Sequence, residues 1–412
     1  MQQTLLFEPF SKSEMHYMNR FLLAMSAATI LSLPWSSSAF AQSSVTIYGT
    51  IDVGVTHVSN AGGAQKRGLT GCNQSGCGVG FRGSEDLGSS LQAIFNLEAG
   101  FNPLTGATGS GGTFFSKRAY MGFTSDLGSL TFGRHTATIA EFVGGFESGS
   151  AWAAPGKGYG EHPGDMDNLN VSYRVNNSVK YTSPNFSGLS FGALYGFGEQ
   201  TQFSKNHIAS FAAKYENGPW KVGAGYQSSD NPNFSLFAGN ANASATGNNM
   251  PFGQFKGFAS AGSQQVMALG SSYNIGKATV GAVYSSVKFG QLGSVPVTGL
   301  PAAQAAYRGD AKFANSEVNL RYQVTDALMA GVGYFLTKGA AGSGFGSQTY
   351  RQLNVGAVYS LSKRTSFYSL YALQNARGTD STGAVAVAAL DGATPSTTSR
   401  QNVVLFGIRH RF

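Results

Sequence analysis

Charged side chains are scarce in this sequence, at 12% of 412 residues, whereas soluble domains usually carry roughly 25%. Long apolar runs are missing as well. Beyond residue 41 no stretch approaches the roughly 18 consecutive apolar residues that a membrane helix requires. The mean hydropathy is close to zero, at −0.09. These two deficits exclude a bundle of membrane helices and are unusual for a soluble domain.

Cysteine is nearly absent, since the chain has only Cys72 and Cys77. Their spacing is not CxxC, and no second pair exists to complete a zinc site. In an exported chain we expect a local disulfide that pins a loop, with two free thiols as the alternative. The six histidines are isolated along the chain and show no metal-ligand spacing. The sequence therefore predicts no metal and no cofactor.

Clusters of basic residues are also missing, although the formal net charge is +8. A positive charge of this size raises the question of nucleic-acid binding. The lysines and arginines are spread at one or two per segment, without a basic run. We therefore expect these charges on wet surfaces and no nucleic-acid partner.

What the chain has in abundance is glycine, with 56 residues, and aromatic side chains, at 12%. The glycines follow no three-residue period, which excludes collagen. The last residues alternate between two faces, as a β-strand does. One face is mostly apolar and the other small or basic, respectively Val404, Phe406, Ile408, His410 and Phe412, and Leu405, Gly407, Arg409 and Arg411. This pattern fits either an edge strand of a soluble sandwich or a barrel strand between lipid and water.

The same alternation recurs along the whole chain, which decides between these two alternatives. It is clear at 45–55, 91–101, 189–197, 317–324 and 328–336. Tight turns are predicted at 85–88, 125–128, 185–188, 217–218, 274–276, 325–326 and 362–363. Longer loops are predicted at 59–76, 102–115, 139–172, 199–206, 229–263, 289–312, 338–349 and 376–399.

Seven turns and eight loops predict sixteen strands with turns at one end and loops at the other. This is the layout of an all-β transmembrane antiparallel β-barrel, and sixteen strands leave room for an aqueous channel. A β-propeller would also need many strands, but the sequence has no repeat near 40–50 residues.

The start of the chain resembles an export signal. Arg20 precedes a short apolar run that ends in Ala-Phe-Ala at Ala41, which predicts a secretory signal over 1–41 and a mature barrel over 42–412. The acidic residues before Arg20 are atypical of such a signal, so a translation start at Met18 is an alternative.

Six segments, in their order and spacing, resemble the Gram-negative general-diffusion porin family: 45–49, 80–88, 118–123, 130–134, 174–181 and 407–412. The resemblance implies a homotrimer in the outer membrane of a Gram-negative bacterium, in contact with lipid and lipopolysaccharide. It implies passive diffusion of small hydrophilic solutes and ions, and no enzymatic activity. It also implies that the third long loop folds into the barrel and that Phe412 is part of the signal read by the barrel-insertion machinery.

The resemblance further implies a charged constriction, in which acidic residues of the loop at 139–172 face arginines on the wall. Opposed charges across a narrow pore create a transverse field that selects solutes by charge and size. We expect Glu147 first and Glu141 second in this role. Asp165 and Asp167 are further candidates, with solvated loop charges as the alternative.

Strand parity predicts the basic side of the constriction. Arg118, Arg174, Arg82 and Lys180 alternate with apolar residues and so face the lumen, because a charge on the lipid face costs about 2–4 kcal/mol. Arg118 and Arg174 match the basic positions of the family. Together with the net charge, they predict a mild preference for anions.

Parity sends three other cations outward. We expect Arg134 at the trimer interface, and Lys117 and Arg351 at the extracellular rim.

Two further functions fit the same barrel. A substrate-specific channel would show an aromatic track along the lumen, whereas parity puts most aromatics outward. A loop-mediated adhesin would use the long loops. An outer-membrane hydrolase would need a nucleophile beside a positioned base, and no motif around His135 or His162 provides one.

Overall fold

The computed structural model describes residues 44–109 and 111–412, so the predicted signal over 1–41 lies outside the described residues. The strands are β1 (Ser44–Ala61), β2 (Ala64–Gly71), β3 (Gly78–Gly88), β4 (Leu91–Gly100), β5 (Arg118–Ser125), β6 (Gly128–His135), β7 (Val175–Thr182), β8 (Leu189–Gly196), β9 (Ile208–Asn217), β10 (Trp220–Asp230), β11 (Ser263–Ile275), β12 (Ala278–Leu292), β13 (Gly309–Gln323), β14 (Leu328–Gly339), β15 (Gln348–Ser360), β16 (Thr365–Gly378) and β17 (Arg400–Arg411). The helical elements are α2 (Thr138–Val143), η1 (Gly144–Phe146), α3 (Ser148–Ala151), η2 (Pro163–Asp165), α4 (Pro232–Ser235), η3 (Lys256–Phe258) and α5 (Ala302–Ala305).

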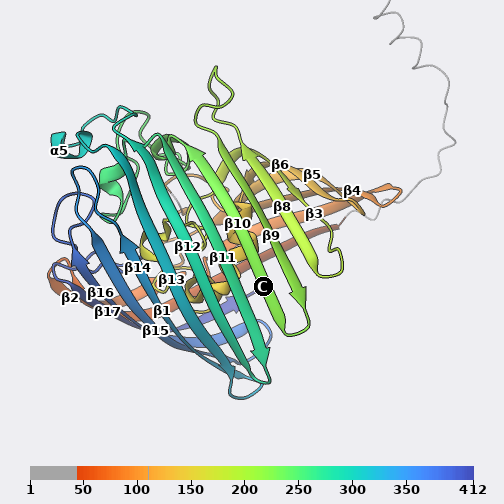
Figure 1. Cartoon of the computed structure of the whole chain (residues 1–412). Helices are drawn as coiled ribbons and strands as arrows, with labels where there is room; N and C mark the ends of the chain where they lie inside the picture. Colours follow the sequence, from red (N-terminus) through yellow and green to blue (C-terminus); the bar gives the residue numbers. More distant parts are fainter. Residues whose placement is uncertain (1–43, 110) are drawn as a thin grey trace, which may run out of the picture. The chain divides into compact units, whose positions relative to one another are not determined.

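The strands form one closed antiparallel barrel (Figure 1). Each strand from β3 to β17 pairs with the next, and β1 pairs with β17 to close the ring. The first part of β1 pairs with β3 and the second part with β2, so β2 and β3 together occupy one position in the wall. The seventeen strands therefore occupy sixteen positions in the barrel wall, and the predicted count of sixteen strands is confirmed.

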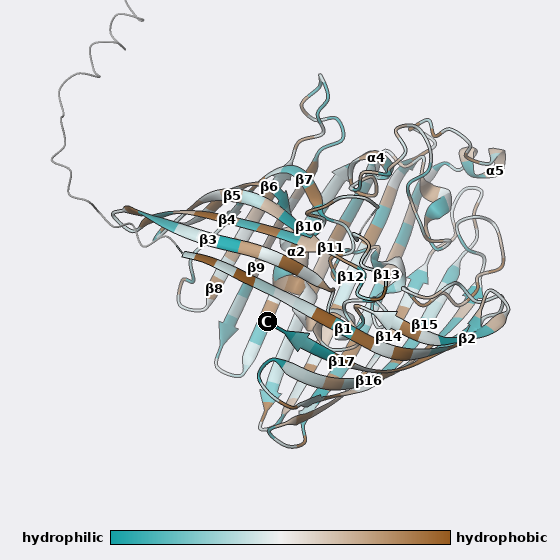
Figure 2. Cartoon of the chain, turned by 180° about the vertical axis from the view of Figure 1, so that it is seen from behind, coloured by the Kyte–Doolittle hydropathy of each residue, from teal (hydrophilic) through white to brown (hydrophobic). Residues whose placement is uncertain are grey.

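Side chains alternate between the outside and the inside of the barrel. In β13, Val318 is 61% exposed and Glu317 is 3% exposed; in β17, Phe406 is 60% exposed and Leu405 is 1% exposed. Figure 2 shows apolar residues recurring along the strands between more polar ones. Among the described residues, no helix has the length and apolarity needed to span a bilayer. The apolar residues on the outside form the lipid-facing surface.

Short turns join the strands at one end of the barrel and longer segments at the other, as predicted. One predicted loop is wrong. Much of 59–76 continues as strand, because β1 and β2 extend into a hairpin through Gly62 and Gly63, whose φ angles are 68° and 104°. Glycine adopts these angles without strain, and the polar hairpin strand Ala64–Gly71 carries no apolar alternation that would have revealed it.

The third long loop, residues 136–174, lies inside the barrel. Its α2 contacts β8, β9, β10 and β11, the strands that follow β7 around the wall (Figure 2). The wall accepts the loop because inward positions opposite it are glycines. A Cβ atom on Gly270 would lie 2.5 Å from the ring of Phe146, and one on Gly331 would lie 2.8 Å from the indole of Trp152.

A second long loop, residues 231–262, adds an aromatic cluster beside the third loop. Phe255 and Phe258 are fully buried against Phe289 and Phe313, which point inward from β12 and β13. Several aromatics thus face the interior, unlike the outward majority that parity predicts. They are covered by loops and form a core under them.

Candidate functional site

A cavity of about 600 Å³ remains between the third loop and the wall formed by β4, β5 and β17. Its lining includes six cationic side chains: Lys117, Arg118, Lys157, Arg174, Arg409 and Arg411. It also includes three carboxylates: Glu98, Glu141 and Glu161. The cavity is therefore charged, with an excess of cations.

Glu98 of β4 organises the cations at the start of β5. Lys117 Nζ lies 3.0 Å from Glu98 Oε1, and Arg118 Nη1 lies 3.1 Å from Glu98 Oε2. The hydroxyl of Tyr48 donates to the same carboxylate at 3.2 Å. Lys117 thus faces the cavity, and its predicted place at an outward rim is wrong. It precedes the first residue of β5, so strand parity does not apply to it.

Arg118 and Arg174 both line the cavity. The side chain of Arg118 is 42% exposed, and so remains accessible to solutes. Arg174 lies directly before β7 and reaches the cavity although the parity behind its prediction fails. Val175 follows Arg174, so the same parity would turn it outward, yet it is buried. Asn177 interrupts the strand alternation with a φ angle of 46°.

Arg82 and Lys180 are not among the residues that line this cavity. Lys180 Nζ lies 2.7 Å from Glu141 Oε1, so β7 holds the one acidic side chain of α2. Arg82 stacks its guanidinium 5.3 Å from the centre of the Tyr48 ring. These two basic side chains therefore support or flank the cavity.

The structure differs from the prediction for three acidic residues of the third loop. Glu147, Asp165 and Asp167 are each 0% exposed and are absent from the cavity lining. Their oxygens accept hydrogen bonds from groups of the loop and, for Asp167, also from Asn315 of the wall. These bonds take the place of the water that the buried acids lose. Of the four predicted acids, only Glu141 lines the cavity, and Glu161 joins it.

One buried group centres on His162. Its Nδ1 donates to Asp167 Oδ2 at 2.7 Å, and its backbone N–H donates to Glu147 Oε1 at 2.9 Å. Its Nε2 lies 3.3 Å from Glu317 Oε2 of β13. Ser148 N–H also donates to Glu317 Oε1, at 2.6 Å. We call His162, Glu147, Asp167 and Glu317 the His162 latch, because they fasten the third loop to the opposite wall.

The latch is held by a buried imidazolium. Burial by itself lowers the pKa of His162, but the carboxylates of Glu147 and Asp167 raise that pKa well above its ordinary value. Burial opposes ionisation of Asp167 too, yet contact with His162 lowers its pKa. Ligand atoms of Glu147, His162 and Glu317 lie within 4.8 Å of one another, as in a metal site. One oxygen of each glutamate already accepts a hydrogen bond from a backbone N–H group. This arrangement fits a group held by an ion-paired imidazolium better than a metal site.

A second buried group, formed by Glu161, Asp165 and Asp391, avoids buried negative charge by holding protons. Burial raises the pKa of Asp165 to about 7 and that of Asp391, in the loop after β16, to about 8. Burial also raises the pKa of Glu161 well above its ordinary value. Asp391 Oδ2 accepts the N–H of Gly164 at 2.7 Å. This group joins the third loop to the last loop of the chain.

The remaining predicted residues lie outside the cavity. Arg134 Nε donates to the carbonyl of Ser116 at 3.0 Å and its Nη1 to that of Gly239 at 2.9 Å, both within the same chain. Its role at a trimer interface stays a prediction. The backbones of Phe412 and Gly49 exchange two hydrogen bonds, both of 3.1 Å.

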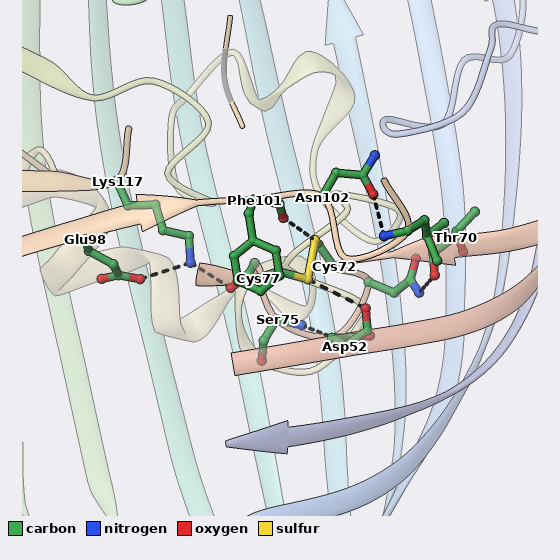
Figure 3. Close-up of a disulfide and its surroundings, with 12 residues drawn as sticks. Asp52, Thr70, Cys72, Ser75, Cys77, Glu98, Phe101, Asn102 and Lys117 are labelled. Atoms are coloured by element: carbon green, nitrogen blue, oxygen red, sulfur yellow. Dashed lines mark hydrogen bonds and ion pairs between the residues drawn. A yellow bond between two sulfur atoms is a disulfide. The ribbon is translucent and has the colours of Figure 1, made fainter. Parts of the chain in front are cut away.

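Cys72 and Cys77 form a disulfide (Figure 3). It closes a segment beside the cavity, which we call the disulfide bulge, residues 72–77.

Several cavity residues were missed by the sequence reasoning, although some had a signal. Arg409 and Arg411 lie on the small, basic face of the terminal strand, and the parity that selected Arg118 would also have selected them. Glu98 lies on the polar face of its strand. Lys157 sits in an irregular segment of the third loop, where no periodicity exists to place it.

Comparison with known proteins gives consistent matches over the barrel. Residues 23–379 match the family of Gram-negative porins. The chain is 28% identical to an outer membrane porin protein of Bordetella pertussis over 382 residues, covering 83% of this chain and 91% of the relative. It is 26% identical to outer membrane porin protein 32 of Delftia acidovorans over 387 residues, covering 92% and 96%. The solved structure of an anion-selective porin from Comamonas acidovorans is similar with a TM-score of 0.68 at 24% identity, covering 90% of this chain and 100% of that one.

Proposed function

Because the chain belongs to the Gram-negative porin family and is an outer-membrane diffusion channel, we propose that its passage runs through the cavity beside the third loop and prefers anions. The channel is passive and is not an enzyme. Small hydrophilic solutes and ions cross the bilayer through the barrel. The charged cavity is the narrow point that a solute must pass.

The excess of cations around the cavity carries this proposal. Six cationic side chains face three carboxylates. Glu98 is neutralised by Lys117 and Arg118, Glu141 by Lys180, and the raised pKa of Glu161 favours its neutral form. A confined positive potential raises the local concentration of anions. The similar structure from Comamonas acidovorans is described as anion-selective, which agrees with this reading.

The lining also favours a channel of broad specificity. None of the residues that line the cavity is aromatic, so the described part of the chain offers no stacking surface for a sugar there. Backbone groups, small side chains and charges dominate the lining. We therefore propose selection by charge and size.

We further propose a homotrimer with Arg134 near the subunit contact. Large apolar side chains cover the outside of β5 and β6, including Met121 at 60% and Phe132 at 43% exposure. Neighbouring subunits and lipid, with lipopolysaccharide at the extracellular rim, would cover this surface. The insertion machinery would read the exposed Phe412.

The anion preference is tested by replacing Arg118 and Arg174 together with glutamine. Removing two cations from the cavity lowers the positive potential, so the anion-to-cation permeability ratio should fall several-fold. The ratio is measured as the reversal potential in planar bilayers across a salt gradient. Arg82→Gln is the matched control, because Arg82 lies outside the cavity.

Two results would contradict this proposal. An unchanged reversal potential in the double variant would remove Arg118 and Arg174 from the selective site. A lack of conductance from correctly folded wild-type protein would contradict an open passage beside the third loop.

A further inference from the structure

We propose that the disulfide bulge, residues 72–77, is a second selectivity element, which faces the third loop across the cavity and holds two of the cavity cations in place. This inference rests on the proposed function, because it concerns the same cavity. Ion preference would then depend on a second segment, which is closed by a disulfide and is remote from the third loop in sequence.

The bulge is an insertion in the barrel wall. β1 pairs Val53 with Gly71 of β2 and Thr50 with Gly78 of β3. Two residues of β1 therefore face the six residues 72–77, four more than a regular ladder would hold. The extra residues leave the wall toward the lumen, where Gln74, Ser75 and Gly76 line the cavity.

The bulge is anchored to the wall by Asp52, a buried carboxylate of β1 (Figure 3). Asp52 Oδ2 accepts the N–H of Ser75 at 2.8 Å, and the Asp52 carbonyl accepts the N–H of Cys72 at 2.8 Å. Asn73 Nδ2 donates to the hydroxyl of Tyr368 at 3.1 Å. The disulfide ties together the two ends of the bulge, whose Cα atoms lie 4.9 Å apart.

Two cavity cations take their positions from the bulge. Lys117 Nζ donates to the carbonyl of Gly76 at 2.6 Å as well as contacting Glu98 (Figure 3). Arg409 Nη1 donates to Ser75 Oγ at 3.1 Å. If the bulge changes shape, both charged groups lose a fixed partner. The charge that a passing ion meets then becomes less ordered.

The bulge also docks the tip of the third loop. Lys157 N–H donates to the Asn73 carbonyl at 3.0 Å, and Gln74 Nε2 donates to the Trp152 carbonyl at 2.9 Å. Gly156 packs so closely that a Cβ there would lie 2.2 Å from the backbone of Ser75. The bulge and the third loop therefore form two sides of one constriction, and the width of the gap depends on both.

Opening the disulfide tests this role. A dithiol reductant transfers two electrons to the sulfur–sulfur bond, leaving Cys72 and Cys77 as thiols and forming its own cyclic disulfide. We compare three samples in planar bilayers: the oxidised protein, the same protein after dithiothreitol, and the Cys72→Ser/Cys77→Ser variant. Reduction after insertion avoids any dependence on how the variant folds. Mass spectrometry after thiol alkylation reports how much disulfide has opened.

We expect the reduced protein and the serine variant to behave alike. The anion-to-cation permeability ratio should be roughly halved, and the single-channel current should become noisier, because Lys117, Arg409 and the loop tip lose a fixed support. Dithiothreitol should not change the serine variant further, which shows that its effect requires this disulfide.

The outcomes separate this inference from the proposed function. An oxidised channel with anion preference whose reduced form, verified by alkylation, has the same permeability ratio and current noise would overturn the inference alone. An oxidised protein that conducts without anion preference would instead overturn the proposed selectivity.

Discussion

At the scale of single residues, the carboxyl groups of the third loop achieve burial in two ways. In the His162 latch an imidazolium pairs with the carboxylate of Asp167, while burial raises the pKa of Glu147 well above its ordinary value. The group of Glu161, Asp165 and Asp391 keeps protons instead, as their raised pKa values show. A buried carboxylate without a partner costs several kcal/mol, so each solution lets an acidic loop pack inside the barrel. The two groups should therefore respond differently to pH.

The proton-holding group predicts that the third loop loosens as the pH rises. The docked state raises the pKa of Asp165 to about 7 and that of Asp391 to about 8, so it binds protons that the undocked loop releases. Its contribution is complete below the ordinary carboxyl pKa and is lost as the pH rises through 7 and 8. Between the ordinary carboxyl pKa and these raised values, docking should weaken by about tenfold per pH unit for each group.

Hydrogen exchange of the segment around residues 161–172, corrected for intrinsic exchange, measures this effect. Asp391→Asn is the informative variant, since an amide still accepts from Gly164 but cannot ionise. It should flatten the pH dependence. Protection that stays constant from acid to alkaline pH in the wild type would show that these groups do not titrate with docking.

At the scale of elements, glycines in the wall decide where the third loop lies. Strands β10, β11, β14 and β15 place glycine at inward positions that meet Phe142, Phe146 or Trp152. These glycines leave space into which the aromatic side chains of the loop pack. The docking site of the loop is thus a set of wall positions without side chains. It can be recognised only when the loop and the strands are seen together.

Gly331→Val should displace the loop from this wall. The new side chain would begin 2.8 Å from the Trp152 indole, and overpacking of this kind typically costs about 1–3 kcal/mol. We expect a lower midpoint of thermal unfolding and noisier single-channel currents.

Gly68→Val is the matched control, because it also adds a branched side chain to a strand but has no neighbour within 4 Å. Equal effects of the two substitutions would mean that the loop does not depend on the space at Gly331.

At the scale of the whole molecule, the barrel is closed by its first and last strands. β1 and β17 pair from Thr50 with Arg411 to Val58 with Val403. Phe412 extends this seam through its two backbone hydrogen bonds with Gly49. Its side chain is 44% exposed and so remains available for recognition. The end of the chain therefore takes part in closing the barrel.

Deleting Phe412 should reduce the amount of folded barrel that reaches the outer membrane. The deletion removes two hydrogen bonds at the seam, each worth about 1 kcal/mol, together with the exposed terminal aromatic. The folded fraction is measured by the shift in gel mobility between unheated and heated samples.

Phe412→Tyr keeps the backbone bonds and the aromatic ring, so it should assemble normally. Wild-type levels of the deletion variant would show that neither the seam nor the insertion machinery needs this residue.

The sequence by itself determined the barrel, its sixteen strands and the facing of most strand residues, such as Arg118 and Phe406. The physical reason is local: a wall between lipid and water imposes a period of two on every strand, and turns mark each reversal. Parity failed for Val175, near the irregular position Asn177, and for Lys117, which lies before the start of its strand.

Only the tertiary structure decided which loop charges face the cavity. Glu147 and Glu141 are close in sequence and alike in chemistry, yet one is buried at the His162 latch and the other lines the cavity. Loops have no periodicity, and their environment depends on distant partners, as Glu317 of β13 does for His162 and Asp391 does for the backbone of Gly164. Burial of a charge in this loop depends on such long-range contacts as well as on local ones, because both replace the water that the charge loses.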